Sequence, residues 1–221
     1  MKRIGLGLVL LLMAAACEPA ASPTPSVACP EGPPTEVEAQ AVLADARLAT
    51  ITVSGAVSGE IAIELYGEAA PIATANFVSL ARCGFYDGIS FHRVLTGFVI
   101  QAGDPQTKGR EGDFENLGRG GPGYEFEIEP PADDLGYDPY SVSMANNGQT
   151  NGSQFFIALG DLNGGLQRLY TIFGQVLSGT DVVDAIAAVP VNDPRFGVPL
   201  TTVRIERIAI SADADPSASD G

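Results

Sequence analysis

Short apolar runs and turn-forming residues alternate along the chain from about residue 46 onward. The runs 49–54 and 60–66 alternate apolar with polar side chains and are joined through Gly55 and Gly59, so they predict two neighbouring strands. Runs of the same kind predict further strands at residues 89–94, 98–102, 124–128, 141–145, 154–158, 170–176 and 202–210.

Three segments have the spacing of helices instead. Pro71 opens one that ends before Gly84, because proline suits the first helical position and glycine the position after the last. A second helix is predicted at residues 180–188, with Asp181 in its first turn, and a short one within 36–48. Many short strands with two helices among them predict a mainly β fold, with a mostly antiparallel, closed or nearly closed sheet covered by helices.

The first seventeen residues have the pattern of an export signal. Lys2 and Arg3 precede thirteen apolar residues, 4–16, a stretch too short to span a membrane but typical of a signal peptide. Three alanines then precede Cys17, an arrangement that resembles the lipobox of bacterial lipoproteins, although Ala14 stands where that pattern usually has leucine. We therefore predict lipidation of Cys17 and a membrane-anchored, extracytoplasmic protein. The alternative is an ordinary cleaved signal peptide and a soluble secreted or periplasmic protein.

Residues 18–45 are rich in Pro, Ala and Ser, which predicts a tether between the anchor and a domain at 46–212. Residues 213–221 read as a polar tail. Cys29 and Cys83 can form a disulfide after export. Because one is predicted in the tether and the other at a helix end, we expect them to stay unpaired.

Composition excludes several classes of function. The 27 Asp and Glu residues against 12 Lys and Arg give a formal net charge of -15, which argues against nucleic acid as a partner. One His and three Cys rule out a zinc site with several histidines and a framework of several disulfides. We expect no metal and no cofactor. The glycine-rich string 118–123 contains Pro122 and leads into a predicted strand, so it reads as a loop and not as a dinucleotide site.

Three blocks of sequence resemble the cyclophilin-type peptidyl-prolyl isomerases. Residues 91–104 read FHRVLTGFVIQAGD, residues 143–146 read SMAN and residues 151–157 read NGSQFFI, in the order and spacing of that family. Residues 171–176 and 71–77 resemble its V-F-G-x-V strand and its first helix. The resemblance implies an eight-stranded antiparallel β-barrel closed by two α-helices, and catalysis of rotation about X-Pro bonds in polypeptide substrates, with the chain acting as a monomer.

The resemblance also implies roles for individual residues. Arg93 matches the donor that hydrogen-bonds the prolyl nitrogen as the amide twists, and Gln101 matches the neighbour that orients it. The remaining matches line the substrate site: Phe98, Val99, Phe156 and Leu166 form the proline pocket, Ala145, Asn146 and Gln154 face the residue before proline, and His92 and Tyr170 shape the walls.

Gly164 and Gly165 fall where relatives often have Trp, which puts tight binding of cyclosporin in doubt. A binder or chaperone that holds proline segments in the same groove without catalysis is the main alternative function. A hydrolase using His92 with Ser153 or Ser90 would need an oriented imidazole and an oxyanion hole that the sequence does not specify.

Overall fold

A computed structural model describes residues 27–111, 114 and 117–213. The predicted signal peptide with Cys17, residues 18–26 of the predicted tether and residues 214–221 of the predicted tail lie outside the described residues.

Eight strands follow one another around a single antiparallel sheet, in the order β3-β4-β7-β6-β8-β2-β1-β9, and the short β5 pairs with β7. Hydrogen bonds from Ile205 N to Ile89 O and from Phe91 N to Val203 O join the segment before β3 to β9, so the sheet curls back on itself. The predicted mainly β, eight-stranded antiparallel architecture is confirmed. The strands are β1 (Leu48–Gly55), β2 (Gly59–Leu65), β3 (Arg93–Leu95), β4 (Val99–Ala102), β5 (Phe126–Glu127), β6 (Ser141–Asn146), β7 (Thr150–Ala158), β8 (Ile172–Ser178) and β9 (Val203–Ser211).

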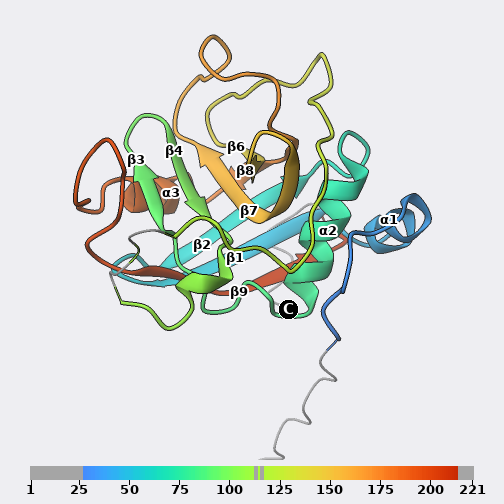
Figure 1. The fold of residues 1–221 in the computed structure, drawn as a ribbon, viewed down its shortest axis with the longest axis horizontal. Coiled ribbons are helices and arrows are strands. Elements are labelled where there is room, and N and C mark those ends of the chain that lie inside the picture. Colours follow the sequence, from blue (N-terminus) through green and yellow to red (C-terminus); the bar gives the residue numbers. More distant parts are fainter. Residues whose placement is uncertain (1–26, 112–113, 115–116, 214–221) are drawn as a thin grey trace, which may run out of the picture.

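The α-helices lie outside the barrel. Figure 1 shows α2 (Pro71–Arg82) and α3 (Thr180–Ala187) on opposite sides of the sheet, with α1 (Glu36–Leu43) beyond α2. A single 3-10 turn, η1 (Pro105–Thr107), follows β4. None of the described helices has the length and apolar character needed to cross a membrane.

Alternation along the strands divides the apolar side chains into two clusters. The larger one fills the barrel, where Phe77 of α2 packs against Tyr86, Phe155 and Phe173 with ring centroids 5.0–5.5 Å apart. The smaller one lies on the outer face of the sheet and contains Phe156, the neighbour of Phe155 in β7. One strand therefore supplies both the interior and an external apolar surface.

Helix α2 begins at Pro71 without a side-chain cap from Ala70. The carboxylate of Glu129 accepts instead, from the N–H groups of Ile72 (3.0 Å) and Ala73 (2.7 Å). A carboxylate at this end also complements the helix dipole. A residue more than fifty positions away in sequence thus caps the helix.

The predicted strand 89–94 is shorter than expected, since only β3 (Arg93–Leu95) pairs as a strand with β4. Residues 89–91 bond to β9 instead, as a bridge between the two edges of the sheet. The predicted strand 124–128 shrinks to Phe126–Glu127, between the turn at Gly123, with φ 99°, and Pro130.

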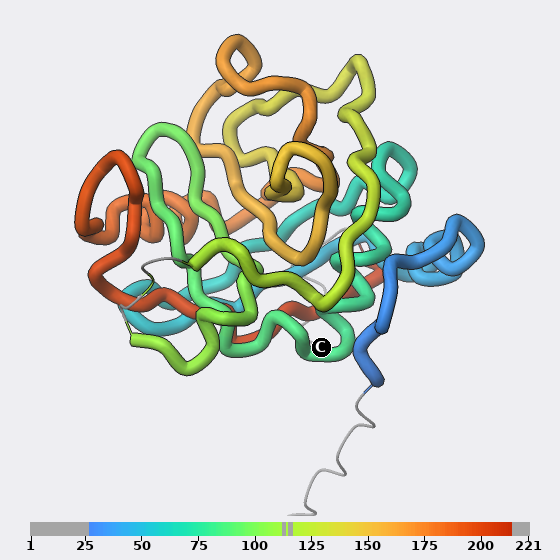
Figure 2. The backbone as a smooth tube through the Cα atoms, viewed as in Figure 1, coloured from blue at the N-terminus to red at the C-terminus, as the bar shows by residue number. Residues whose placement is uncertain are grey.

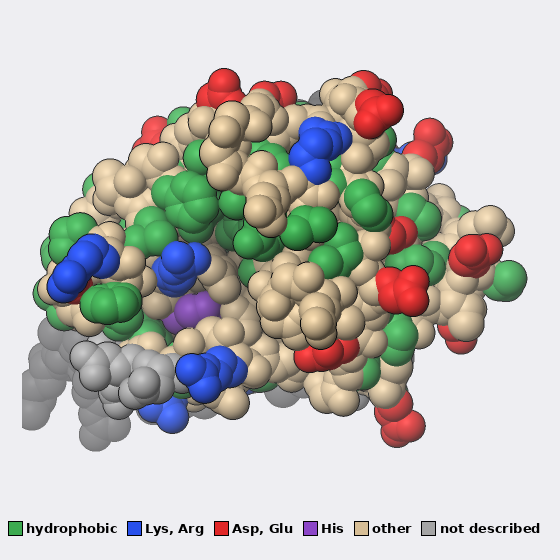
Figure 3. Space-filling view, turned by 45° about the horizontal axis from the view of Figure 1, so that its top comes forward, with side chains coloured by type: hydrophobic (Ala, Val, Ile, Leu, Met, Phe, Trp, Pro, Cys, Tyr) green, Lys and Arg blue, Asp and Glu red, His purple; other side chains and the backbone are tan. Residues whose placement is uncertain are grey.

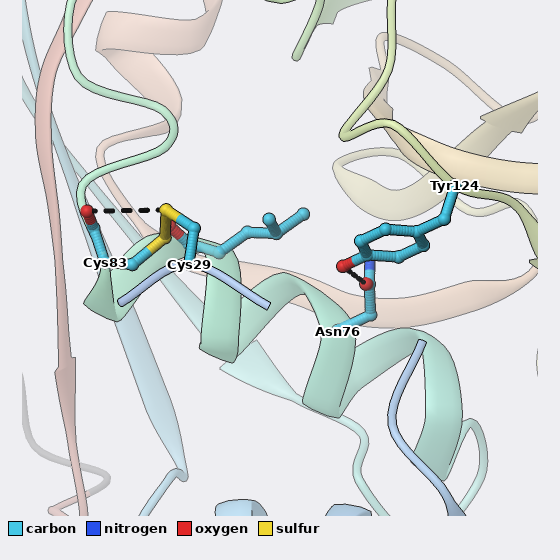
Figure 4. The surroundings of a disulfide bond; sticks show 5 residues. Cys29, Asn76, Cys83 and Tyr124 are labelled. Carbon is cyan, nitrogen blue, oxygen red and sulfur yellow. Dashed lines mark hydrogen bonds between the residues drawn. A yellow bond between two sulfur atoms is a disulfide. The ribbon is translucent and has the colours of Figure 1, made fainter. Parts of the chain in front are cut away.

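The expectation that Cys29 and Cys83 stay unpaired is wrong. They form a disulfide across 54 residues, shown in Figure 4 at the C-terminal end of α2. The sequence pattern did not show that the chain before α1 turns back along α2, which places the two cysteines side by side.

Residues 27–45, which we call the N-terminal strap, belong to the segment predicted as a tether. Within the strap, Thr35 and Glu38 form a reciprocal capping box that starts α1. Arg82 at the end of α2 donates to the carbonyl of Val42 (3.2 Å) and pairs with Asp45 (2.6 Å). The strap, which contains α1, is therefore held against α2 by an ion pair and a disulfide.

Candidate active site

Strand register brings the two predicted catalytic residues and one pocket residue into a row. Arg93 in β3 lies opposite Gln101 in β4, and Gln101 lies opposite Phe156 in β7. Because directly opposed residues share a face of the sheet, all three side chains point outward, while Phe155 and Ile157 point into the barrel.

A chain of hydrogen bonds runs along this row and ends on a loop. Arg93 Nη1 donates to Gln101 Oε1 (3.3 Å), and Gln101 Nε2 donates to Gln154 Oε1 (2.9 Å). Gln154 Nε2 then donates to the carbonyl of Gly120 (2.8 Å). We call this series from Arg93 to Gly120 the guanidinium relay.

The two ends of the relay fix the orientation of both amides. A guanidinium only donates and a carbonyl only accepts, so Gln101 and Gln154 each have one arrangement that satisfies both neighbours. Arg93 is thereby held by a partner that cannot rotate without losing bonds. This is a preorganised donor, the property required of a group that stabilises a charge developing during reaction.

Arg93 is half-buried. Burial lowers the pKa of its guanidinium, and Tyr170 acts in the opposite direction. The group remains charged, because arginine does not lose its proton in proteins. Partial removal of water around it strengthens the hydrogen bonds that it makes.

The predicted proline pocket lies in the outer apolar cluster. Val99 and Phe156 are buried there, and Tyr170 meets Phe156 edge to face with ring centroids 5.6 Å apart. Phe98, Leu166 and Ala145 pack against the same cluster. The structure thus brings six of the predicted substrate-binding residues together on one surface.

Residues that sequence reasoning missed complete this pocket. Tyr137 is buried behind Tyr170, and its hydroxyl donates to the carbonyl of Tyr170 (3.0 Å). Leu162 and Ile172 are also buried in the cluster. Tyr137 and Leu162 come from two long loops, 128–140 and 159–171, which run side by side in Figure 2, and Ile172 begins β8. Only the spatial pairing of these loops identifies them.

A groove of about 750 Å³ adjoins the relay. Ala145, Asn146 and Gln154 line it, together with Tyr124 and the glycine-rich loop 118–121. Partial burial raises the pKa of Tyr124 to about 12, so its hydroxyl stays protonated and donates to Asn76 of α2 (2.7 Å; Figure 4). The glycine-rich string is a loop, as the sequence indicated, and it forms one wall of the groove.

Asp104 holds that loop in place. Its buried carboxylate accepts the N–H groups of Gln106 (2.8 Å), Gly118 (2.6 Å), Arg119 (3.2 Å) and Gly120 (3.2 Å). A Cβ at Gly120 would overlap this carboxylate, which explains the glycine. Asp104 is the last residue of the block 91–104, and the glycine-rich string 118–123 is also evident in the sequence. The sequence pattern did not predict the contact between them.

His92 does not line the groove but lies behind Gly118 of the glycine-rich loop. It is 5% exposed, and neither ring nitrogen has a hydrogen-bond partner among the described residues. Burial lowers its pKa to about 4, so the imidazole is neutral at physiological pH. It lines a second, smaller hollow next to Arg93. The oriented, basic imidazole that a hydrolase needs is therefore missing.

Gly164 and Gly165 lie in an exposed turn, and a Cβ on either would meet nothing within 4 Å. Leu166 beside them still joins the outer cluster. This side of the pocket is therefore open to solvent. Among the described residues, no group of three or more His, Cys, Asp or Glu side chains is arranged to hold a metal ion.

Comparison with known proteins agrees with this geometry. Residues 48–210 match the family described as cyclophilin type peptidyl-prolyl cis-trans isomerase/CLD. The chain is 43% identical over 176 residues to peptidyl-prolyl cis-trans isomerase A of Mycobacterium tuberculosis, covering 69% of this chain and 87% of the relative. It is 39% identical over 163 residues to human peptidyl-prolyl cis-trans isomerase-like 3, covering 70% and 92%.

A solved structure is also similar. The cyclophilin type peptidyl-prolyl cis-trans isomerase of Cryptosporidium parvum superimposes with a TM-score of 0.65 at 30% identity, covering 77% of this chain and 99% of that one. The same protein solved in the presence of the dipeptide Ala-Pro gives a TM-score of 0.64, covering 75% and 99%. The N-terminal strap precedes the matched residues. This chain belongs to the cyclophilin-type peptidyl-prolyl cis-trans isomerase family.

Proposed function

We propose that this chain accelerates rotation about X-Pro peptide bonds by directing the guanidinium of Arg93 at the prolyl nitrogen of a polypeptide bound across the outer face of β3, β4 and β7. The observation that carries the proposal is the guanidinium relay, which fixes a charged donor beside an apolar pocket.

The physical chemistry of the amide explains why one donor suffices. Resonance in the planar bond gives a barrier of about 18–20 kcal/mol, and uncatalysed isomerisation takes about 10–100 s. In the twisted state the nitrogen regains a lone pair, so it accepts a hydrogen bond that neither planar state can accept. A donor fixed at that position binds the twisted state preferentially and lowers the barrier.

The outer cluster supplies the rest of the site. The proline ring is aliphatic and gains mainly from burial against apolar side chains, which Phe156, Val99 and Phe98 provide. The residue before proline lies in the adjoining groove, toward Ala145 and Asn146. The Cryptosporidium relative was solved in the presence of the dipeptide Ala-Pro, which supports a proline-containing substrate.

The test is isomerisation of a short X-Pro peptide, followed by NMR exchange spectroscopy, with wild type, Arg93→Ala and Arg207→Ala. Arg207 is an exposed arginine on β9 and serves as the matched control. We expect kcat/KM to fall about 10²-fold in Arg93→Ala and to stay unchanged in Arg207→Ala. Absence of catalysis by the folded wild type on several X-Pro peptides would leave the non-catalytic binder as the better account.

The substrates that we propose are exported proteins, with the chain acting as a monomer anchored by lipid at Cys17. The support is the apolar stretch 4–16, which ends in three alanines directly before Cys17. Mass spectrometry of the mature protein tests this. A diacylglyceryl group on Cys17 is expected, and an unmodified N-terminus created by cleavage elsewhere would instead indicate a secreted or periplasmic protein.

A further inference from the structure

A second hollow, of about 370 Å³, opens beside Arg93, and none of its described lining residues lines the groove. Its described walls combine apolar and polar side chains. In Figure 3 the purple imidazole lies at the floor of a depression between basic side chains. The residues that line the hollow are His92, Arg93, Phe114, Leu117, Asn192, Phe196 and Val198.

The loop 192–198 is fixed relative to the catalytic strand. Val94, which follows Arg93 in β3, donates its N–H to the carbonyl of Gly197 (2.7 Å). Gly197 has φ 71°, and a Cβ there would overlap the backbone of Val94. The hollow therefore keeps a constant position next to the Arg93 guanidinium.

His92 and Asn192 are the uncharged polar side chains among the described lining residues. His92 is buried and its two ring nitrogens bond to none of the described residues. Asn192 accepts from the N–H groups of Asp193 (2.6 Å) and Val198 (3.2 Å) through Oδ1, so its amide presents the Nδ2 donor.

The apolar wall is also unusual. Phe196 is 63% exposed, and the Arg195 guanidinium lies against it, 5.5 Å from the ring centroid. An exposed aromatic ring on a fixed loop beside a substrate site is a typical anchor for another ring.

We propose that this hollow is a subsite for an aromatic side chain, tyrosine above all, that the substrate polypeptide carries one or two residues after the proline. The inference rests on the proposed function, because the substrate must first place its proline beside Arg93. With the preceding residue in the groove, the following residues leave toward the 192–198 loop, where the hollow is the next recess. A tyrosine ring packs against Phe196 and Val198, and its hydroxyl accepts from the Asn192 amide.

Binding of matched peptides to the full chain tests the subsite independently of turnover. The peptides share one Ala-Pro bond and carry Tyr, Phe or Ala at the first or second position after proline. We expect the better Tyr peptide to bind at least fivefold more tightly than its Ala counterpart, with Phe between them. Because His92 is the only histidine, its imidazole NMR signals are unambiguous, and they should shift with the Tyr peptide and not with the Ala peptide.

Variants in the loop identify the residues responsible. We expect the ratio of Tyr to Ala affinities to fall to within twofold in Phe196→Ala and to decrease in Asn192→Ala. Leu200→Ala is the matched control, since Leu200 is an exposed apolar residue just after this loop that does not line the hollow. That variant should keep the wild-type ratio.

Equal affinities for the Tyr and Ala peptides in wild type would overturn the subsite, as would a Tyr preference that survives Phe196→Ala or leaves the His92 signals unmoved. Failure of the proposed function has a different signature, namely that none of the peptides shows accelerated exchange between cis and trans, whatever its affinity.

Discussion

The outer face of β3, β4 and β7 and the N-terminal strap are held in place by different kinds of interaction. On the outer face, side-chain amides, a buried carboxylate and loop backbone hold Arg93 through hydrogen bonds. On the strap, a disulfide and an ion pair fasten a short helix against α2. The hydrogen bonds on the outer face set the direction of the Arg93 guanidinium. The disulfide and the ion pair only keep the strap attached to α2. Substitutions should therefore affect activity in one region and stability in the other.

The largest expected effect is on the strap. Replacing both cysteines, Cys29→Ser with Cys83→Ser, removes a cross-link that closes 54 residues, and chain entropy then predicts a loss of about 4 kcal/mol in the free energy of unfolding. Urea denaturation measures it, with reduced wild type as a second reference. We expect kcat/KM to stay within twofold. An unchanged unfolding midpoint would show that the disulfide does not stabilise the fold.

The next largest expected effect is the loss of stability at acidic pH that His92 causes. Its folded pKa of about 4 lies below the usual 6.5, so the unfolded chain binds more protons between these values. Stability is full above pH 6.5 and falls as pH drops toward 4, by about 3 kcal/mol in total. The urea denaturation midpoint, measured at pH 7, 5.5 and 4.5, should fall more steeply with decreasing pH in wild type than in His92→Phe. Parallel profiles would mean that His92 is not protected from protonation.

Asp104→Asn should lower both stability and activity, although Asp104 lies in only one of the two regions. Its carboxylate holds the glycine-rich loop and, through Gly120, the end of the guanidinium relay. An amide cannot accept all the backbone N–H groups that the carboxylate accepts, so we expect about 2 kcal/mol of destabilisation. We also expect a several-fold drop in kcat/KM at temperatures where the variant is folded. Full activity in a folded Asp104→Asn protein would show that the position of the glycine-rich loop does not affect catalysis.

The smallest effect concerns the cap of α2. Glu129→Gln weakens the acceptor for the first helical N–H groups and should cost about 1 kcal/mol with no change in kcat/KM. Glu127→Gln, an exposed neighbour on β5, is the control and should leave the midpoint where it is. Equal shifts in the two variants would indicate a general charge effect on an acidic protein and not a specific cap.

Local sequence patterns were enough to predict the strands, α2 and α3, because alternation and helix-terminus residues act over short distances. The block 91–104 also contained both Arg93 and Gln101, which the short β3–β4 hairpin places directly opposite each other. The Cys29–Cys83 bond, the Glu129 cap and the contact of Asp104 with Gly120 join distant segments. They depend on how the chain returns to α2 and to the groove, which periodicity does not encode.

The central claim is that the orientation of the Arg93 guanidinium, and not its charge alone, accelerates isomerisation. The direct measurement is kcat/KM of Arg93→Lys on an X-Pro peptide by NMR exchange, beside wild type and Arg93→Ala. Lysine keeps the charge but lacks the rigid fork that bonds Gln101 and the prolyl nitrogen together. We predict at least a tenfold loss in folded Arg93→Lys. Activity within twofold of wild type would contradict the account, since a point charge would then suffice.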